Sequence, residues 1–273
     1  MRTIFHAFLG SGLLFQLAAQ SPEPPKVLRI IREDIKEGRT PAHQKTETRF
    51  AQAMARNKYP TNYLALTSMT GPSQAWFLEG YGAISSLADT LAFEGKVGEF
   101  ETLDALDAAN RASTTLSIAM YRPDLSYHSA EMMTALPKAR YFNVITVHLR
   151  FDHDLEFAEL AKTAIEAAEK AASDQPVVVY QVVSGMPAGT YLLMEPAPSL
   201  KAMDEAPARS RALMQAMGES GARKFLKNAG EAIAGEDPIL FAIEPKMSYV
   251  SKEFAKGDPE FWAPKPAKTN TTK

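Results

Sequence analysis

The chain has 273 residues, of which 45% are apolar, so it is long enough to bury one large core or two ordinary ones. Its 30 basic and 32 acidic side chains nearly balance and form no long run of one sign, which excludes the basic surface of a nucleic-acid binder. It has no cysteine, which excludes disulfides, thiolate metal sites and a lipid-modified N-terminal cysteine.

Residues 1–20 have the pattern of a secretory signal peptide. Arg2 supplies the positive charge, residues 7–17 the apolar stretch, and residues 17–20 the small side chains of a cleavage site. The apolar stretch is too short to span a bilayer comfortably. We therefore expect an exported protein, periplasmic or secreted, whose mature chain begins near Ser21 and has no membrane span.

The rest of the chain predicts the same order of elements twice. In the first half the order β-α-β-β-α-β is predicted at residues 27–32, 41–57, 62–69, 74–80, 84–92 together with 102–113, and 116–120. In the second half it is predicted at residues 142–151, 155–172, 177–184, 190–195, 200–234 and 239–242. Glycine and proline at 70–73 and 185–189 join the two central strands of each half as a hairpin.

A repeated segment follows the last strand of each half. Residues 121–131 and 243–253 share Pro, Ser, Tyr, Ser and Glu in register, with Pro123 against Pro245, an offset of 122. Five matches in register indicate an internal repeat, and the apolar run before each segment indicates a final strand that leaves into an ordered turn.

The repeated order is that of the ferredoxin-like unit, an antiparallel sheet of four strands with both helices on one face. One copy would leave the other face exposed, whereas two copies can bury it by packing sheet against sheet. We therefore predict an α+β fold in which two tandem ferredoxin-like modules, residues 21–138 and 139–262, form an intramolecular pseudo-dimer. Residues 263–273, rich in Pro, Lys and Thr, are predicted to be a disordered tail that follows the docked Trp262.

The element order and the duplicated Pro-x-(Leu/Met)-Ser-Tyr-x-Ser-x-Glu ending resemble the dimeric α/β-barrel superfamily, and within it the NIPSNAP-like and antibiotic-biosynthesis-monooxygenase-like branches. The resemblance covers nearly the whole mature chain and does not separate the branches. It implies that the two sheets close into a barrel. Because the superfamily includes cofactor-free oxygenases, haem enzymes, lyases, sensors and proteins of unknown role, the activity stays open, and no branch's catalytic motif is matched here.

Strand alternation and differences between the two copies select the candidate pocket. In the strand at 142–151 the face from Ile145 to Phe151 is uniformly apolar and is predicted to lie under the helices, so the other face points into the barrel. An offset of 116 places Arg32 at the position of His148. The full candidate set is His148, Arg150, Arg32, Arg122, Glu244, Glu79, Glu195 and His128.

Two interpretations of this set stay open. His148 could titrate near neutral pH and act as an acid or base, with the other charged groups orienting a ligand. Alternatively the charges form ion pairs at strand ends, which we favour because buried charges are costly unless paired. The repeated Ser126-Tyr127 and Ser248-Tyr249 pairs are predicted to be structural, because a turn must persist in both copies whereas a catalytic site need survive in only one.

No metal and no cofactor are predicted. The sequence Asp152-His153-Asp154 matches no standard ligand spacing and is typical of a helix cap. His43 is predicted to be an exposed residue in the first turn of its helix. Haem is disfavoured because residues 200–234 contain no histidine, and the sequence has no phosphate loop, hydrolase elbow or zinc-protease helix.

The sequence therefore predicts an exported, small-molecule-binding or non-catalytic α/β-barrel protein. Its expected partners are a small apolar or aromatic ligand and further copies of itself, with no nucleic acid. The alternative is a cofactor-independent monooxygenase-like enzyme that acts in the barrel cavity. A cavity above about 300 Å³ lined by His148, Arg150 and Arg32 would favour an enzyme or a binder.

Overall fold

The computed structural model describes residues 23–262, so the expected signal peptide (1–20) and tail (263–273) lie outside the described residues. Eight strands close into one antiparallel barrel in the order β1-β3-β2-β8-β5-β7-β6-β4, and the α+β prediction is confirmed. The strands are β1 (Val27–Ile35), β2 (Tyr63–Ser68), β3 (Gln74–Tyr81), β4 (Arg111–Tyr121), β5 (Tyr141–Leu149), β6 (Val178–Ser184), β7 (Thr190–Ala197) and β8 (Ile233–Ile243).

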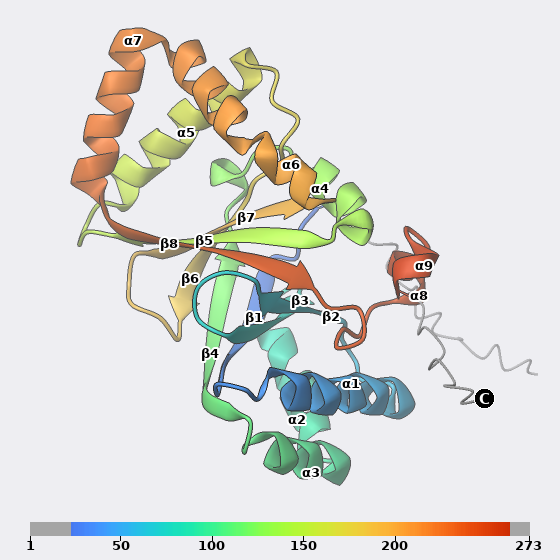
Figure 1. Cartoon of the computed structure of the whole chain (residues 1–273). Coiled ribbons are helices and arrows are strands. Elements are labelled where there is room, and N and C mark those ends of the chain that lie inside the picture. The colour runs from blue at the N-terminus through green and yellow to red at the C-terminus, as the bar shows by residue number, and fades with distance from the viewer. Residues whose placement is uncertain (1–22, 263–273) are drawn as a thin grey trace, which may run out of the picture.

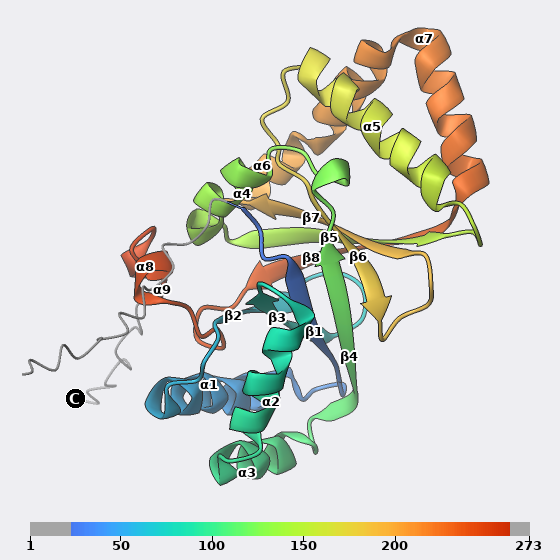
Figure 2. The ribbon, with the colours of Figure 1, turned by 180° about the vertical axis from the view of Figure 1, so that it is seen from behind.

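Helices cover the outside of the barrel in two groups. Figures 1 and 2 show the helices of the first half on one side of the barrel and those of the second half on the opposite side. The first group is α1 (Thr40–Asn57), α2 (Leu87–Glu94) and α3 (Gly98–Asp107); the second is α5 (Asp154–Lys170), α6 (Leu200–Asp204) and α7 (Ala206–Ala232). The short helices α4 (Ser129–Ala135), α8 (Lys252–Ala255) and α9 (Pro259–Trp262) lie near one end of the barrel. Within the described residues no helix is both long and apolar enough to cross a membrane.

The last strand of each half is longer than predicted. β4 begins at Arg111 and β8 at Ile233, in stretches that the helical pattern covered. These residues extend because they pair with β1 and β5, a long-range contact that no local periodicity reports. The helical stretch predicted at 200–234 is divided into α6 and α7, and α7 changes direction at Gly218, whose φ of 70° suits a residue without Cβ.

Apolar side chains from all eight strands fill the middle of the barrel. Trp76 and Phe241 lie with their ring centroids 5.2 Å apart, and the indole N–H donates to Gln74 Oε1 at 3.1 Å. In β5, Val144 faces this core while Val147 packs under α5, as alternation predicts. The prediction for Phe151 is wrong: its side chain is 96% exposed, because the strand has already ended at Leu149.

The two halves pair their strands in the same register. Residues of β1 and β2 correspond to second-half residues 114 positions later, residues of β3 to those 116 later, and residues of β4 to those 122 later. With these offsets the pair Arg29↔Glu79 corresponds to Asn143↔Glu195, and the pair Val27↔Met120 to Tyr141↔Ala242. The helices α1 and α5 also begin 114 positions apart. By this register the counterpart of Arg32 is Thr146, not His148 as the sequence offset suggested.

The repeated serine after each final strand binds the opposite half. Ser126 Oγ donates to the carbonyl oxygen four residues earlier at 2.7 Å and accepts the N–H of Val179, in β6, at 2.9 Å. Ser248 Oγ makes the same pair of bonds at 2.8 and 2.9 Å, the second from the N–H of Ala65, in β2. Each serine therefore ties its own half to the other, which gives the repeat a structural role.

Candidate functional site

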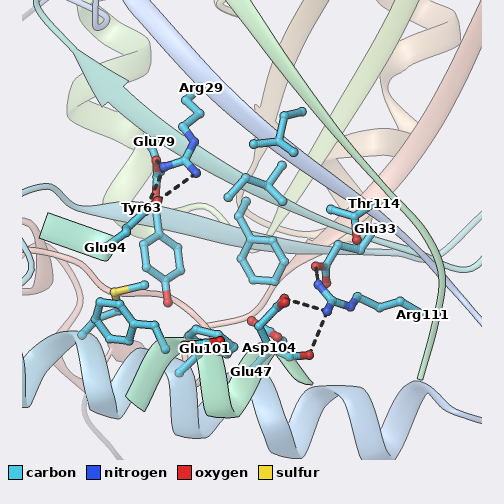
Figure 3. Close-up of a pocket in the computed structure, with 16 residues that line it drawn as sticks. Arg29, Glu33, Glu47, Tyr63, Glu79, Glu94, Glu101, Asp104, Arg111 and Thr114 are labelled. Carbon is cyan, nitrogen blue, oxygen red and sulfur yellow. Dashed lines mark hydrogen bonds and ion pairs between the residues drawn. The ribbon is translucent and has the colours of Figure 1, made fainter. Parts of the chain in front are cut away.

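A cavity of about 370 Å³ lies between the outer face of the first-half sheet and the layer of α1, α2 and α3. Its walls are aromatic and aliphatic, formed by Ile31, Phe50, Met54, Tyr63, Phe77, Phe100 and Leu116. Figure 3 shows that charged side chains gather at two places, with Arg29, Glu79 and Glu94 at one and Glu33, Glu47, Asp104 and Arg111 at the other. The size and the mixture of apolar walls with a few charged groups are those of a small-ligand site.

Helical and strand periodicity bring titratable groups to this layer. Glu33 is an outward-facing residue of β1, and His43 and Glu47 lie one turn apart on the buried face of α1. The same face continues with Phe50 and Met54, which line the cavity. Two of these four residues on the buried face of α1, His43 and Glu47, are therefore titratable, whereas the buried face of an ordinary amphipathic helix is apolar.

Four of these groups form a buried cluster: Glu33, His43, Glu47 and Asp107, which we call the carboxylate–histidine cluster. One ligand-type atom from each lies within 4.8 Å of the others. His43 Nδ1 is 2.8 Å from Asp107 Oδ2, and its Nε2 is 3.7 Å from Glu33 Oε2. His43 and Asp107 are fully buried, and neither His43 Nε2 nor Glu33 Oε2 has a hydrogen-bond partner among the described residues.

Arg111 and Asn110 flank the cluster. Arg111 donates to Glu33 Oε1 at 2.6 Å and to Asp104 Oδ1 at 2.7 Å, and its Nε lies 3.3 Å from Asp107 Oδ2. Asn110 donates to Asp107 Oδ1 at 2.9 Å. The buried part of the site therefore holds three carboxyl groups against a single guanidinium.

This surplus of carboxyl groups shifts their pKa values. Burial raises the pKa of Glu47 well above its ordinary value, and the nearby Glu33 and Asp107 raise it further. Burial also raises the pKa of Glu33, although the bond from Arg111 opposes the shift. At Asp107 burial acts upward too, but the hydrogen bonds from His43 and Asn110 outweigh it and lower the pKa. The cluster is thus a place where protons or a cation would relieve negative charge.

The other end of the cavity is a closed network. Arg29 donates to Glu79 Oε2 at 3.2 Å and to Glu94 Oε1 at 2.7 Å. The Tyr59 hydroxyl lies 2.5 Å from Glu94 Oε1, and the Tyr81 hydroxyl donates to Glu79 Oε2 at 2.9 Å. Burial and the adjacent Glu79 raise the pKa of Tyr81 to about 12. Here every charged group has a partner of opposite charge, as expected of a structural network.

The second half has an equivalent layer without the cluster. By the shared register, the counterparts of Glu33, His43, Glu47 and Arg111 are Val147, Phe157, Ala161 and Ile233. Extending the β4 offset of 122 by four residues matches Asp107 with Ala229. Val147 and Phe157 are buried together with Tyr191 in an apolar cluster, against which Ala161 and Ile233 pack. The fold therefore does not need charged groups at these positions.

The structure does not bring the eight predicted pocket residues together, and only Glu79 lines the cavity. The physical reason is strand alternation: Glu79 faces the helices, whereas Arg32 pairs with Trp76 and shares its barrel-facing side. His148 lies 3.3 Å from Thr190 Oγ1 and 3.2 Å from Asp237 Oδ2. This corrects the expectation of one shared pocket.

The other members of that set have separate local roles. Arg122 and Glu244 lie just past their strands; Arg122 pairs with its neighbour Asp124 at 2.7 Å, and Glu244 accepts the Thr67 hydroxyl at 2.8 Å. Glu195 accepts from the Asn143 side chain at 2.9 Å. His128 stacks on Tyr127 with ring centroids 3.9 Å apart, and Arg150 is exposed beyond the end of β5.

A larger cavity, of about 620 Å³, opens at the barrel end beside α4 and α8. Its lining is mainly apolar and includes Leu28, Leu78, Met132, Phe142, Tyr180, Met194 and Phe254, while its charged side chains, Glu23 and Lys26, are exposed. Neither this cavity nor the one under α1 is lined by His148, Arg150 or Arg32. The sequence criterion for a site in the barrel is therefore not met by either cavity.

The prediction that His43 is exposed is wrong, since this side chain is fully buried. Its position in the first turn of α1 suggested that the His43 side chain is exposed to solvent, but α3 packs against α1 and covers this side chain. One sequence signal could have found the site: His43 and Glu47 stand at the apolar positions of the helix that continues with Phe50 and Met54. Asp107 and Arg111 carry no such local signal.

No protein-family model and no curated protein matches this sequence. Solved structures share its fold. An anthrone oxidase-like protein superposes with a TM-score of 0.52 at 9% identity, covering 85% of this chain and 97% of that one. A protein named "Putative Chlorite dismutase" gives 0.52 at 15% identity, with 82% and 96% covered, and a "Putative monooxygenase" from Fusobacterium nucleatum gives 0.49 at 12%, with 81% and 93%. The two superpositions with a TM-score above 0.5 show a shared fold and nothing about activity.

Proposed function

We propose that the protein binds a small, largely apolar or aromatic molecule with a polar group in the cavity under α1, α2 and α3. The observation that carries this proposal is a cavity of about 370 Å³ whose aromatic walls meet buried charged groups. Burial of apolar ligand surface supplies affinity, and a few polar groups fix the orientation of the ligand. Arg111 and two of the cavity-lining carboxyl groups, Glu33 and Glu47, are the groups that would fix it here.

A thermal-shift screen of the mature chain against quinones, phenols and fatty acids tests this proposal. A ligand at 100 times its Kd stabilises the folded state by about 2.7 kcal/mol. Leu116→Trp narrows the cavity and is expected to abolish the shift; Leu116 is 52% exposed, so the new ring leaves the core undisturbed. Met120→Trp is the matched control, on the same strand and 41% exposed but outside the lining. No stabilisation by any compound would overturn the proposal.

A second candidate is an oxygenase-like enzyme that oxidises the bound molecule with O₂. The observation that favours it is that Glu33 and Glu47 line the cavity while the Asp107–His43 pair stands directly behind them, an arrangement suited to moving protons. This relocates the expected chemistry from the barrel interior to the helix-covered side of the first half. The measurement is oxygen uptake in the presence of anthrones and quinols. If a compound binds and no oxygen is consumed, the enzyme proposal fails and only the binding proposal stands.

We also infer that residues 21–138 and 139–262 are tandem ferredoxin-like modules of common origin. The common register and the two equivalent serine contacts support this. Because both serines bind across the halves, the two segments expressed as separate chains are expected to co-purify as one folded barrel. Failure of the two segments to associate would count against the modular reading.

Export stays a proposal that rests on the pattern of residues 1–20. The expected result of cell fractionation is a periplasmic or secreted protein whose N-terminus lies near Ser21. A full-length cytoplasmic protein that still begins at Met1 would contradict it.

A further inference from the structure

We propose that the carboxylate–histidine cluster binds one divalent transition-metal ion. Its ligands would be His43 Nε2 and one oxygen each from Glu33 and Glu47, and Asp107 would hold His43 in place. The inference goes beyond the proposed function, which requires only the cavity. It also departs from the sequence-based expectation that no metal binds.

The spacing of the cluster fits one ion. Its ligand-type atoms lie within 4.8 Å of one another. Metal bonds to nitrogen and carboxylate oxygen of about 2.0–2.2 Å place two ligands on opposite sides of an ion about 4.0–4.4 Å apart. The side chains therefore lie close enough to share one ion once they turn toward it, and the two proposed ligand atoms His43 Nε2 and Glu33 Oε2 are already 3.7 Å apart.

Two unpartnered atoms point to an ion at this place. His43 Nε2 and Glu33 Oε2 lack hydrogen-bond partners among the described residues, although their side chains are only 0% and 5% exposed. Buried polar atoms are nearly always bonded, because an unbonded one keeps the full cost of its lost hydration. The two atoms face each other at 3.7 Å, too far for a hydrogen bond and a suitable separation for two ligands of a common ion.

The contacts behind His43 are those of a metal-bound imidazole. Asp107 Oδ2 lies 2.8 Å from His43 Nδ1, and Asn110 in turn donates to Asp107 Oδ1 at 2.9 Å. A carboxylate on Nδ1 holds the proton there and leaves the Nε2 lone pair free, directed at Glu33. Such a carboxylate behind the histidine is the usual support of a metal-bound imidazole.

Charge balance favours a divalent ion. Glu33, Glu47 and Asp107 contribute three negative charges when ionised, and Arg111 contributes one positive charge, which leaves two negative charges in a buried site with neutral His43. A divalent cation would neutralise this surplus, which buried carboxylates otherwise avoid by taking up protons.

The second half removes the main structural explanation for the cluster. At the equivalent positions Val147, Phe157 and Ala161 form ordinary apolar packing. A structural ion-pair network would be an expensive substitute for that packing, because both charges of each pair must lose their hydration. A bound ion would explain why the first half has buried charged groups at these positions.

The ligand types and the cavity define what the ion would do. One imidazole with two carboxylates and no thiolate suits Zn²⁺, Mn²⁺, Fe²⁺ or Co²⁺, whereas Ca²⁺ and Mg²⁺ prefer oxygen alone. Glu33 and Glu47 line the cavity, so the remaining coordination positions of the ion would open toward a bound molecule. An oxygen atom of that molecule could then coordinate the ion directly.

Metal binding to the tag-free mature chain tests the inference. Protein stripped with EDTA is dialysed against Zn²⁺, Mn²⁺ or Co²⁺ and the bound metal is measured by mass spectrometry, with the visible spectrum of Co²⁺ as a second readout. We expect about one ion per chain. Glu47→Gln and His43→Gln are expected to lose it, and Asp107→Asn to weaken affinity by roughly 10- to 100-fold. The matched controls, Glu195→Gln and His148→Gln, change the same residue types outside the cluster and should bind as the unaltered chain does.

Less than a tenth of an equivalent bound, or full binding to folded Glu47→Gln, would overturn the inference. If the substitutions prevent folding, the unaltered chain still decides, since one equivalent of metal should raise the unfolding midpoint of the stripped protein. Ligand screening of stripped protein separates the two proposals. Ligand binding without metal binding would remove the metal site alone, and metal binding with no ligand would remove the small-molecule proposal alone.

Discussion

The two helix-covered sides of the barrel share one architecture and differ in chemistry. On the second-half side, Val147, Phe157 and Tyr191 pack beneath α5 as an apolar core. On the first-half side, Glu33 and His43 stand in the places of Val147 and Phe157, beside a cavity. Since both sides fold with the same strand register, the charged version cannot be a requirement of the fold. The difference indicates where to look for function in this fold: at the positions where one half has charged groups and the other half has apolar packing.

Moving a charge into the apolar side should have the largest effect on this comparison. Val147→Glu places the counterpart of Glu33 where it has neither arginine nor histidine beside it, and the free energy of unfolding is expected to fall by about 3–5 kcal/mol. Urea denaturation near neutral pH measures the loss. Val147→Ala, which only removes packing, should cost about 2 kcal/mol. Equal losses in the two variants would mean that this layer tolerates charge.

The reverse exchange gives the first half the residues of the second: Glu33→Val, His43→Phe, Glu47→Ala, Asp107→Ala and Arg111→Ile together. Replacing buried ion pairs by apolar side chains is often neutral or stabilising by about 1–4 kcal/mol, and we expect this result in EDTA, with metal binding lost. Denaturation of both proteins in EDTA provides the comparison. A loss above about 2 kcal/mol would show that the cluster holds the fold. Arg111→Ile alone is the contrasting variant and should destabilise, because it leaves buried carboxyl groups without their cation.

The serine contacts, in contrast, should behave alike in both halves. Ser126→Ala and Ser248→Ala each remove two hydrogen bonds, one of which joins the halves, so each is expected to lower the unfolding free energy by about 1–2 kcal/mol, and by similar amounts. Ser85→Ala, at an exposed position, is the control and should change nothing measurable. Clearly unequal losses at Ser126 and Ser248 would weaken the equivalence of the halves.

The smallest expected effect is a titration. Each half has a tyrosine bonded to a carboxylate, Tyr81 to Glu79 and Tyr191 to Asp154. Burial and these carboxylates raise both pKa values to about 12. An unfolded tyrosine ionises near pH 10, so the folded state retains protons that the unfolded state releases, and stability should be lost as the pH rises from about 10 to 12.

Near-ultraviolet titration of the folded protein is the measurement. Tyr81→Phe and Tyr191→Phe should each remove one tyrosinate from the fraction that ionises late. Ionisation of both residues near pH 10 would show that their carboxylate contacts are not maintained in solution.

Local patterns were enough to predict most elements, since helix and strand periodicities are properties of short segments. The predicted strand at 74–80 and helix at 41–57 differ from β3 and α1 by a residue at most. The offset of 122 between the final strands agrees with their pairing, whereas the offset that matched Arg32 with His148 is two residues too long. Counting along the chain could not detect this, because only strand pairing defines the register.

The site was beyond the sequence for a related reason. His43 and Glu47 could be recognised in the sequence as polar residues on an otherwise apolar face of a predicted helix. No local pattern marks Asp107 and Arg111, because their role depends on α3 packing against α1 and on β4 pairing with β1. The predicted pocket, centred on His148, followed from the assumption that function lies inside the barrel.

Alternation and helical periodicity thus specify the order of elements and the faces of each strand, and the matching residues at an offset of 122 specify the repeated serine turns. Alternation and periodicity depend on residues that are close together in the chain, so they can be recognised in a single sequence. Tertiary structure decided which of those faces would meet a helix layer with a cavity and which charges would share it. Closing the barrel buries one face of every strand in the core and leaves the other to the helices. The packing of α3 against α1 and the pairing of β4 with β1 then set Glu33 beside His43, Glu47 and Asp107.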